Sequence, residues 1–290
     1  MVKSSYSEEI ISKKVVFFTG KGGVGKSAIA SATALLAQRH GKQTFLVSWN
    51  PFDQQARPLP YQSLGIPHLL LNGMDCFREY ALQILKFEKV VDLVFENKVV
   101  NTFISAAPGI TEAVIAGKIW DLSDKHPDAV VLVDLPASGH ALSFFSSPLG
   151  LRKLFRMGLV HREIERICEM MLSPSTLIQL LSIPEELSIS ETLELKKKLV
   201  SLGNFHFSPI FLNQCLPDFP GKAPTPEVAK KALSEKPREL FEYYTTLIEQ
   251  ESDALGVLEK AGLGLRKLPR LSCPEWITTV EAISELLEHS

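Results

Sequence analysis

The sequence contains few cysteines, and none lies close to another. Four cysteines are scattered over 290 residues, and no C-x-x-C pair occurs. This spacing disfavours a zinc or iron–sulfur site within one chain. We therefore expect free, buried thiols in a reducing cytosol, and so a cytoplasmic protein. The four are Cys76, Cys168, Cys215 and Cys273.

The sequence also lacks long apolar runs and an excess of one charge. No run reaches the roughly 18 apolar residues of a membrane span, so we expect no transmembrane segment. Residues 1–14 are too polar and too mixed in charge for a signal peptide. The net charge of −2 gives no global reason to expect nucleic-acid binding. With 45% hydrophobic residues and no internal repeat, the chain can bury a sizeable core as one large or two small α/β domains.

A glycine-rich stretch at residues 20–27 matches the phosphate-binding pattern G-x-x-x-x-G-K-[ST], the Walker A loop. An apolar strand is expected before it at 15–18, and a helix after it at 28–38. Glycines let backbone N–H groups turn around a phosphate, and the helix N-terminus adds its positive end. Lys26 is placed for the β- and γ-phosphates and Ser27 for Mg²⁺. The expected nucleotide-binding residues here are Gly20, Lys21, Gly22, Gly23, Val24, Gly25, Lys26, Ser27 and Ala28.

Lys21 is a second lysine in this loop. The run Lys-Gly-Gly-x-Gly-Lys resembles the loop of deviant P-loop (signature-lysine) NTPases, which include the anion-pump (ArsA-type) and tail-anchored-protein targeting ATPases. In that class the extra lysine reaches across a dimer to the partner's nucleotide. The resemblance therefore implies a homodimer, or a heterodimer with a paralogue. The chain has one such loop, which excludes the tandem form of the anion pump.

Residues 48–53, Ser-Trp-Asn-Pro-Phe-Asp, follow a strand expected at 44–48. Anion-pump and targeting ATPases carry Ser-x-Asp-Pro-Ala-His in this first switch, and their Asp orients the attacking water. Anchored on Ser48 and Pro51, that position is Asn50 in this chain. An amide can hold a water but cannot accept its proton. The resemblance thus implies slow hydrolysis, unless Asp53 or a partner chain supplies the acid.

A continuous apolar strand is expected at 129–133, as in the centre of a parallel sheet. It runs into Asp-x-x-x-Ser-Gly-His at residues 134–140, which resembles the second switch of the same family. The resemblance implies that Asp134 holds the Mg²⁺ shell and that the Gly139 amide senses the γ-phosphate. For His140 a structural hydrogen bond is the favoured interpretation.

Two further positions resemble the family's adenine side. Asn213 follows a strand expected at 205–212, where the family has an Asn that reads the adenine edge, and an amide offers the donor and acceptor this needs. Pro269 follows the last expected strand, at 263–268, in a stretch that resembles the adenine-side loop.

Apolar residues at 75–95 surround a predicted helix on all sides, so this helix is buried or meets a partner. Further helices are expected from 108 to 120 and from 148 to 172. Three of the five methionines lie in the last of these. Methionine adapts to varied partners, so a groove for a hydrophobic protein client and an ordinary core are about equally favoured. We expect a helical subdomain at about 75–125 and 147–175.

We therefore predict a single α/β domain over residues 1–290, a P-loop NTPase with a mostly parallel sheet, helices on both faces and a helical subdomain. The resemblance implies a nucleotide-switched dimeric ATPase that binds ATP, ADP and Mg²⁺. Lys21, Lys26, Asn50 and Asp134 would act in hydrolysis, and Ser27 with Asp134 would bind the metal. Two alternatives stay open: a degenerate ATP-binding scaffold that regulates an active paralogue, and a phosphotransferase.

Overall fold

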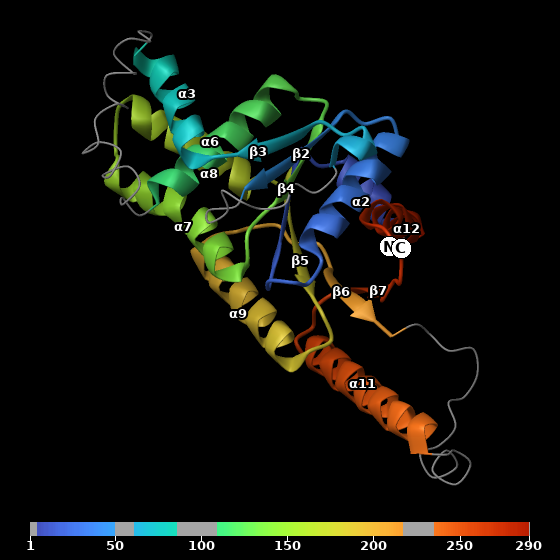
Figure 1. Cartoon of the computed structure of the whole chain (residues 1–290). Coiled ribbons are helices and arrows are strands. Elements are labelled where there is room, and N and C mark those ends of the chain that lie inside the picture. Colours follow the sequence, from blue (N-terminus) through green and yellow to red (C-terminus); the bar gives the residue numbers. More distant parts are fainter. Residues whose placement is uncertain (1–4, 50–60, 86–108, 217–234, 290) are drawn as a thin grey trace.

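The computed structural model describes residues 5–49, 61–85, 109–216 and 235–289. Its described strands form one parallel sheet in the order β3-β2-β4-β1-β5-β6-β7 (Figure 1). The sheet with helices on both faces confirms the predicted α/β class. The strands are β1 (Val15–Gly20), β2 (Thr44–Trp49), β3 (His68–Leu71), β4 (Val130–Asp134), β5 (Thr176–Ser182), β6 (Ile210–Cys215) and β7 (Leu265–Pro269).

Helices cover the two faces of the sheet in separate groups, as Figure 1 shows. One group packs on one face and comprises α1 (Tyr6–Ile11), α2 (Lys26–Arg39) and α12 (Trp276–Glu288). The opposite face carries α6 (Ile110–Lys125), α7 (Ser138–Leu154), α8 (Leu159–Leu172) and α9 (Glu186–Leu202). The remaining described helices are the 3₁₀ turn η1 (Tyr61–Leu64), α3 (Gly73–Leu85), which packs on α6, and α11 (Glu235–Lys260), which contacts α9.

The central strand β1 contributes side chains to the hydrophobic cores on both faces of the sheet. Its six residues are all buried, and successive side chains of a strand point to opposite faces. Phe17 joins the core under α6 to α9, whereas Val16 and Phe18 join the core under α2 and α12. A strand buried on both faces needs the continuous apolar sequence that this segment has.

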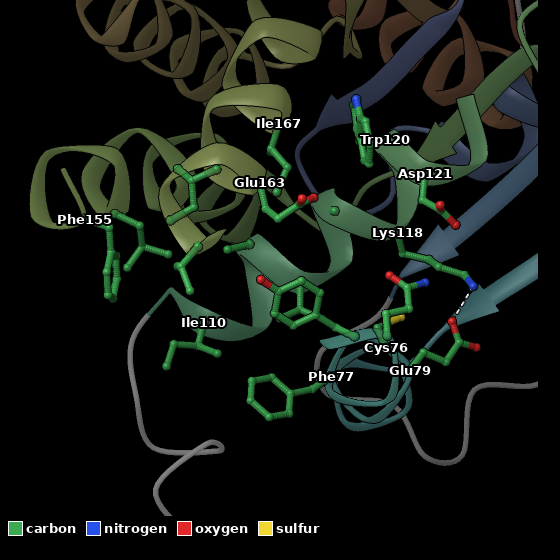
Figure 2. A pocket seen from close by; sticks show the side chains of 18 of the residues that line it. Cys76, Phe77, Glu79, Ile110, Lys118, Trp120, Asp121, Phe155, Glu163 and Ile167 are labelled. Atoms are coloured by element: carbon green, nitrogen blue, oxygen red, sulfur yellow. Dashed lines mark hydrogen bonds and ion pairs between the residues drawn. The ribbon is translucent and has the colours of Figure 1, made fainter. Parts of the chain in front are cut away.

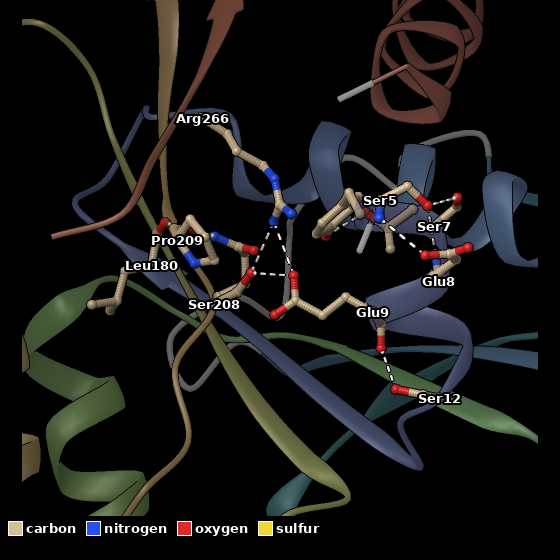
Figure 3. Close-up of polar contacts among 12 residues, drawn as sticks. Ser5, Ser7, Glu8, Glu9, Ser12, Leu180, Ser208, Pro209 and Arg266 are labelled. Carbon is tan, nitrogen blue, oxygen red and sulfur yellow. Dashed lines mark hydrogen bonds and ion pairs between the residues drawn. The ribbon is translucent and has the colours of Figure 1, made fainter. Parts of the chain in front are cut away.

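The short helix α1, which the sequence did not predict, packs beside α2 and α12 and contacts residues of β6 and β7 (Figure 3). Ser5 and Glu8 form a reciprocal capping box at its start. Glu9 accepts a hydrogen bond of 2.9 Å from Arg266 of β7, and Tyr6 packs edge-on against Phe211 of β6. Residues near the start of the chain are thus held to the strands nearest its end.

Some element boundaries differ clearly from the sequence prediction. β6 begins later than expected, at Ile210, and also ends later, at Cys215, so that it includes Asn213. The helix expected at 148–172 is two helices, because the chain turns at Gly158 with φ +94°, a conformation that favours glycine. α7 also starts earlier, at Ser138, and contains Pro148 in its interior. The part of the 75–95 helix beyond residue 85 lies outside the described residues.

None of the helices that the structure describes is long and apolar enough to cross a membrane. The cysteines are free thiols, as predicted, with three buried and Cys273 partly exposed. α3, α6, α7 and α8 pack against one another, and the helical subdomain at about 75–125 and 147–175 stays a prediction. The extent of one domain over residues 1–290 stays a prediction.

Candidate functional site

The glycine-rich loop joins β1 to α2, as its sequence predicts. Two of its glycines are required by close approach. A Cβ at Gly20 would lie 2.2 Å from the carbonyl oxygen of Leu181 in β5. Gly25 has φ +92°, and a Cβ there would lie 2.5 Å from the amide nitrogen of Asn213. A side chain at Gly20 would therefore push the loop away from β5. A side chain at Gly25 would strain the backbone and displace the Asn213 amide from its contact with Val24.

Lys26 begins α2, and its ammonium turns back onto the loop. Nζ donates to the carbonyl oxygens of Gly20 at 3.2 Å and Lys21 at 3.0 Å. Burial lowers the pKa of Lys26, and the nearby Asp134 carboxylate opposes this effect. A cation that is partly desolvated and satisfied only by neutral carbonyls favours an incoming anion.

Ser27 and Asp134 meet at the carboxyl end of the sheet. β4 pairs with β1 so that Asp134 lies opposite Phe18, which brings it beside the start of α2. Ser27 Oγ donates to Asp134 Oδ2 at 2.5 Å. The other oxygen, Oδ1, is buried and has no hydrogen-bond partner among the described residues. Burial raises the pKa of Asp134 from 3.8 to about 6, against the opposing effects of the Ser27 hydroxyl and the Lys26 ammonium.

This pair fits a divalent cation. Mg²⁺ prefers hard oxygen ligands and is usually held by one or two protein oxygens together with substrate phosphates. An orphaned carboxylate oxygen in a buried site costs free energy until a proton, a donor or a cation reaches it. Ser27 and Asp134 supply a hydroxyl and that oxygen side by side. Their predicted role as metal ligands stays a prediction, which this arrangement supports.

Lys21 lies close to a residue that the motif does not contain. Its Nζ is 3.9 Å from Oε1 of Glu191 in α9, and both side chains are partly exposed. The second oxygen of Glu191 accepts a hydrogen bond of 3.4 Å from Ser138, the first residue of α7. Glu191 therefore lies between the glycine-rich loop and the start of the helix that follows Asp134.

Asn213 and Gln214 both contact the glycine-rich loop, although consecutive residues of a regular strand point to opposite faces. The register of β6 against β7 shifts between Leu212 and Cys215, and Gln214 has φ +60°. Asn213 Nδ2 donates to Val24 O at 2.9 Å, and Gln214 Nε2 donates to Gly23 O at 3.4 Å. The Asn213 amide thus holds the loop, and its role at an adenine stays a prediction.

Tyr61 is a further buried residue at this site that the sequence did not indicate. Burial raises the pKa of its hydroxyl, and hydrogen bonds with Ser48 and Ser27 oppose that effect. Its ring stacks on His68 at 4.0 Å, and His68 Nε2 forms a hydrogen bond of 3.0 Å with Ser48 Oγ. The contact with Ser27 links Tyr61 to the Ser27–Asp134 pair.

The other predicted site residues divide into those near the loop and those outside the described residues. Ala28 lies in the first turn of α2, and Gly139 in the first turn of α7, with open space where a Cβ would be. Pro269 ends β7 opposite Cys215, at the same end of the sheet. Asn50, and Asp53 as the alternative acid in the same segment, lie outside the residues that the structure describes.

A second feature lies away from the sheet edge, within the packed helices α3, α6, α7 and α8. A mostly apolar cavity of about 460 Å³, partly open to solvent, lies there and is lined among others by Phe77, Ile110 and Ile167 (Figure 2). Lys118 pairs with Glu79 at one end of it, and Phe155 lies at the opposite end. No group of three or more His, Cys, Asp or Glu side chains in the described ranges could hold a metal ion.

Comparisons with known proteins give a matching family and several relatives. Residues 13–176 match the family model described as anion-transporting ATPase. "ATPase BagA" of Mycobacterium tuberculosis is 29% identical over 222 residues, which cover 69% of this chain and 64% of that protein. "ATPase ASNA1 homolog 1" of Paramecium tetraurelia is 28% identical over 156 residues, or 50% of this chain and 47% of that protein.

"Arsenical pump-driving ATPase" of Escherichia coli is 29% identical over 150 residues, which cover 46% of this chain and 25% of that protein. The match to the mycobacterial protein thus spans just under two thirds of that relative's length. The residues from β1 to the start of β5, which hold Lys21, Lys26, Ser27 and Asp134, lie inside the matched family range.

Proposed function

The chain belongs to the anion-transporting ATPase family, and we propose that it is a nucleotide-switched ATPase that binds Mg·ATP and associates as a dimer. The observation that carries the proposal is the contact between Ser27 and Asp134, with the buried, unpartnered Oδ1 of Asp134 beside it. A buried carboxylate with one oxygen unsatisfied is a costly arrangement, which a bound cation would compensate.

Different groups at the loop would bind the phosphates and the metal of Mg·ATP. Lys26 leaves the carbonyl oxygens of Gly20 and Lys21 and donates to phosphate oxygens, while backbone N–H groups of the loop surround them. Ser27 and Asp134 would hold Mg²⁺, which neutralises charge on the phosphates when it is bound. The Gly139 amide lies at the N-terminus of α7, which follows Asp134 closely, so it would report the γ-phosphate to that helix.

Hydrolysis is proposed to be slow. Asn50 stands where the family's first switch has an Asp, and an amide cannot take a proton from the attacking water. General-base help is typically worth about 10²–10⁴ in rate. Slow hydrolysis leaves the ATP-bound state long-lived, so that the protein can stay associated with its partner in that state. Hydrolysis to ADP would return the protein to its other nucleotide state.

Dimerisation would free Lys21 from Glu191 and direct it to the partner's nucleotide. The partner would be a second copy or a paralogue. The cavity between α3, α6, α7 and α8 is the proposed contact for a hydrophobic protein client, since nucleotide-driven movement of α7 would alter its walls. The names of the relatives favour an ATPase over a phosphotransferase. We propose a cytoplasmic location.

The test is to measure ATP affinity by calorimetry and phosphate release by a coupled assay on the same preparation. We expect tight Mg-dependent binding with slow turnover. Asn50→Asp should raise kcat by about 10² or more while leaving ATP affinity nearly unchanged. The matched control is Asp53→Asn, which should leave turnover as it is.

Two results would contradict the proposal. Failure to bind ATP in the presence of Mg²⁺ would remove the whole function. Fast ATP hydrolysis by the wild type, lost in Asp53→Asn, would contradict only the proposed slow hydrolysis. The protein would then still be an ATPase, with Asp53 as the acid that acts on the attacking water.

A further inference from the structure

The turn between α7 and α8 exposes a concentration of apolar side chains. Five of the thirteen exposed large hydrophobic residues among the described ranges fall within seven consecutive positions. The three most exposed are Met157 at 84%, Leu154 at 75% and Leu159 at 58%. Single exposed apolar residues are ordinary on protein surfaces, but contiguous apolar patches are usually functional. We call residues 152–162 the α7–α8 tip; its exposed apolar members are Leu154, Phe155, Met157, Leu159 and Val160.

The same tip carries only positive charge. No Asp or Glu occurs between Asp134 and Glu163, although the whole chain is slightly acidic. Arg152 is 3.8 Å from Glu165, and the other cations have no ion pair with any residue that the structure describes. The cationic side chains of the tip are Arg152, Lys153, Arg156 and Arg162. Three cations without an ion pair, together with the partly neutralised Arg152, form a local field that favours an anionic partner.

Two of the three most exposed apolar side chains of the tip, Met157 and Leu159, are not part of the neighbouring cavity. Leu154, Phe155 and Val160 line that cavity. A ligand that filled the cavity would therefore leave Met157 and Leu159 in water. Their partner must lie outside the cavity, across the surface of the tip.

Apolar side chains beside cations at a protruding turn match the layered chemistry of a lipid surface. Acyl chains lie beneath a plane of phosphates, so short apolar side chains insert while Arg and Lys remain at the phosphate level. Clusters of four or more Lys and Arg next to an amphipathic segment favour anionic lipids. An apolar peptide helix would satisfy Met157 and Leu159 but would leave Lys153, Arg156 and Arg162 without a counter-charge.

We propose that the α7–α8 tip docks the protein peripherally onto an anionic membrane surface, with Met157, Leu159 and Leu154 inserted among the acyl chains and Lys153, Arg156 and Arg162 at the lipid phosphates. The proposal goes beyond ATP binding and does not depend on it. The tip is formed by α7 and α8 alone and contains none of the residues assigned to the nucleotide.

The experiment is co-sedimentation of the full chain with phosphatidylcholine vesicles, with and without phosphatidylserine. Each cation near an anionic surface is worth about a fivefold gain in partitioning, so we expect at least about 100-fold tighter binding to the anionic vesicles. Binding should weaken steeply with salt, since the Debye length falls from about 10 Å at 0.1 M to about 3 Å at 1 M.

Two double variants separate the charge from the apolar contribution. Lys153→Glu with Arg156→Glu should remove the preference for anionic vesicles, and Met157→Ser with Leu159→Ser should weaken binding to them at least tenfold. The matched controls lie on α9, where Val200 is 57% exposed, close to the value for Leu159, and Lys197 is exposed. Val200→Ser and Lys197→Glu should bind as the wild type does.

A further readout reports insertion directly. Met157→Trp should show a blue-shifted emission component with anionic vesicles but not with neutral ones. ATP affinity is measured on every variant and should be unchanged, which separates this proposal from the proposed ATPase. Equal binding to neutral vesicles, equal loss in the α9 controls, or no sedimentation of the wild type would overturn the proposal. If the tip variants instead lose only the binding of a soluble apolar helical peptide, the tip is a protein-binding surface and the proposal is wrong.

Discussion

The carboxyl end of the sheet, where the nucleotide is proposed to bind and which we call the edge below, and the helical layer of α3, α6, α7 and α8 are built in opposite ways. At the edge, a few polar atoms hold one another at fixed distances, as in the Ser27–Asp134 contact of 2.5 Å and the Asn213–Val24 contact of 2.9 Å. In the helical layer, apolar side chains from four helices surround a cavity of about 460 Å³. Removing one polar atom from the first kind of site leaves its partner unsatisfied, so binding is lost in one step. In the second kind, replacing one apolar side chain changes the packing and the affinity only gradually.

The largest expected effect compares two lysines, one from each region. Lys26→Ala should weaken ATP binding by at least about 100-fold, because it removes charge-assisted hydrogen bonds to the phosphates. Lys118→Ala in the helical layer removes a partly exposed ion pair with Glu79 and should leave ATP affinity unchanged. Calorimetry on both variants decides the matter. Similar losses in the two would mean that the edge is not the nucleotide site.

The second effect concerns the free-energy cost of Asp134 at the edge. A pKa raised from 3.8 to about 6 corresponds to about 3 kcal/mol of native-state destabilisation at neutral pH. Asp134→Asn should therefore stabilise the metal-free chain by up to about that amount while it abolishes Mg-dependent ATP binding. Urea unfolding in the presence of a chelator measures the first effect, and calorimetry measures the second.

The stability difference between the wild type and Asp134→Asn should depend on pH. In the wild type, the penalty is full above pH 6, where the buried carboxyl is ionised, and it vanishes below about pH 4, where the native and unfolded states are both protonated. The stability advantage of Asp134→Asn should therefore shrink as the pH falls. An advantage that is constant with pH would show that the buried charge is not its cause.

The third and smaller effect concerns the dimer that Lys21 is proposed to join. Lys21→Ala should weaken ATP-driven association by about tenfold or more, since it removes a charged contact at the interface. Glu191→Gln should act in the opposite direction, by about two- to threefold, because it only releases a partly exposed pair. Light scattering with a non-hydrolysable ATP analogue measures both. Equal shifts in one direction would refute the idea that Glu191 restrains Lys21.

The smallest effect tests whether the two regions communicate. If α7 transmits the nucleotide state, ATP should change hydrogen exchange in α6 and α8 by a few-fold, because local opening depends on the contacts that α7 makes with them. α12, which packs on the opposite face of the sheet against α2, is the internal control. Equal protection of α6 and α8 with and without ATP would make the helical layer an ordinary core.

The sequence predicted the parts of the edge that lie in one motif or directly after an apolar strand. Lys26, Ser27 and Asp134 belong to this group, because the strand, loop and helix around the motif each have a local signal. Glu191 and Tyr61 could not be predicted in this way, since each comes from an element that reaches the loop only by packing. No spacing in the sequence indicates their partners.

The boundary of β6 shows a second limit. Phe205 and Phe207 continue the apolar pattern of Ile210 and Phe211 and so favour a longer strand. In the structure, Phe205 packs against Phe145 of α7, and Phe207 makes only an isolated bridge to Ile178. Burial under a helix and burial within a sheet produce the same apolar sequence over so few residues.

The irregular end of β6 has a consequence for the speed of nucleotide capture. Gln214 is a non-glycine residue in the left-handed conformation, which costs about 1–2 kcal/mol of strain. In this conformation Asn213 donates a hydrogen bond to the carbonyl of Val24 and Gln214 donates one to the carbonyl of Gly23. The loop is thereby held in its shape before any phosphate arrives. On the proposed function, an incoming nucleotide would meet a loop backbone that is already in place, and only the Lys26 ammonium would have to leave its carbonyl partners. The association rate would then depend mainly on diffusion and electrostatic attraction. The rest of the protein could adjust mainly the dissociation rate.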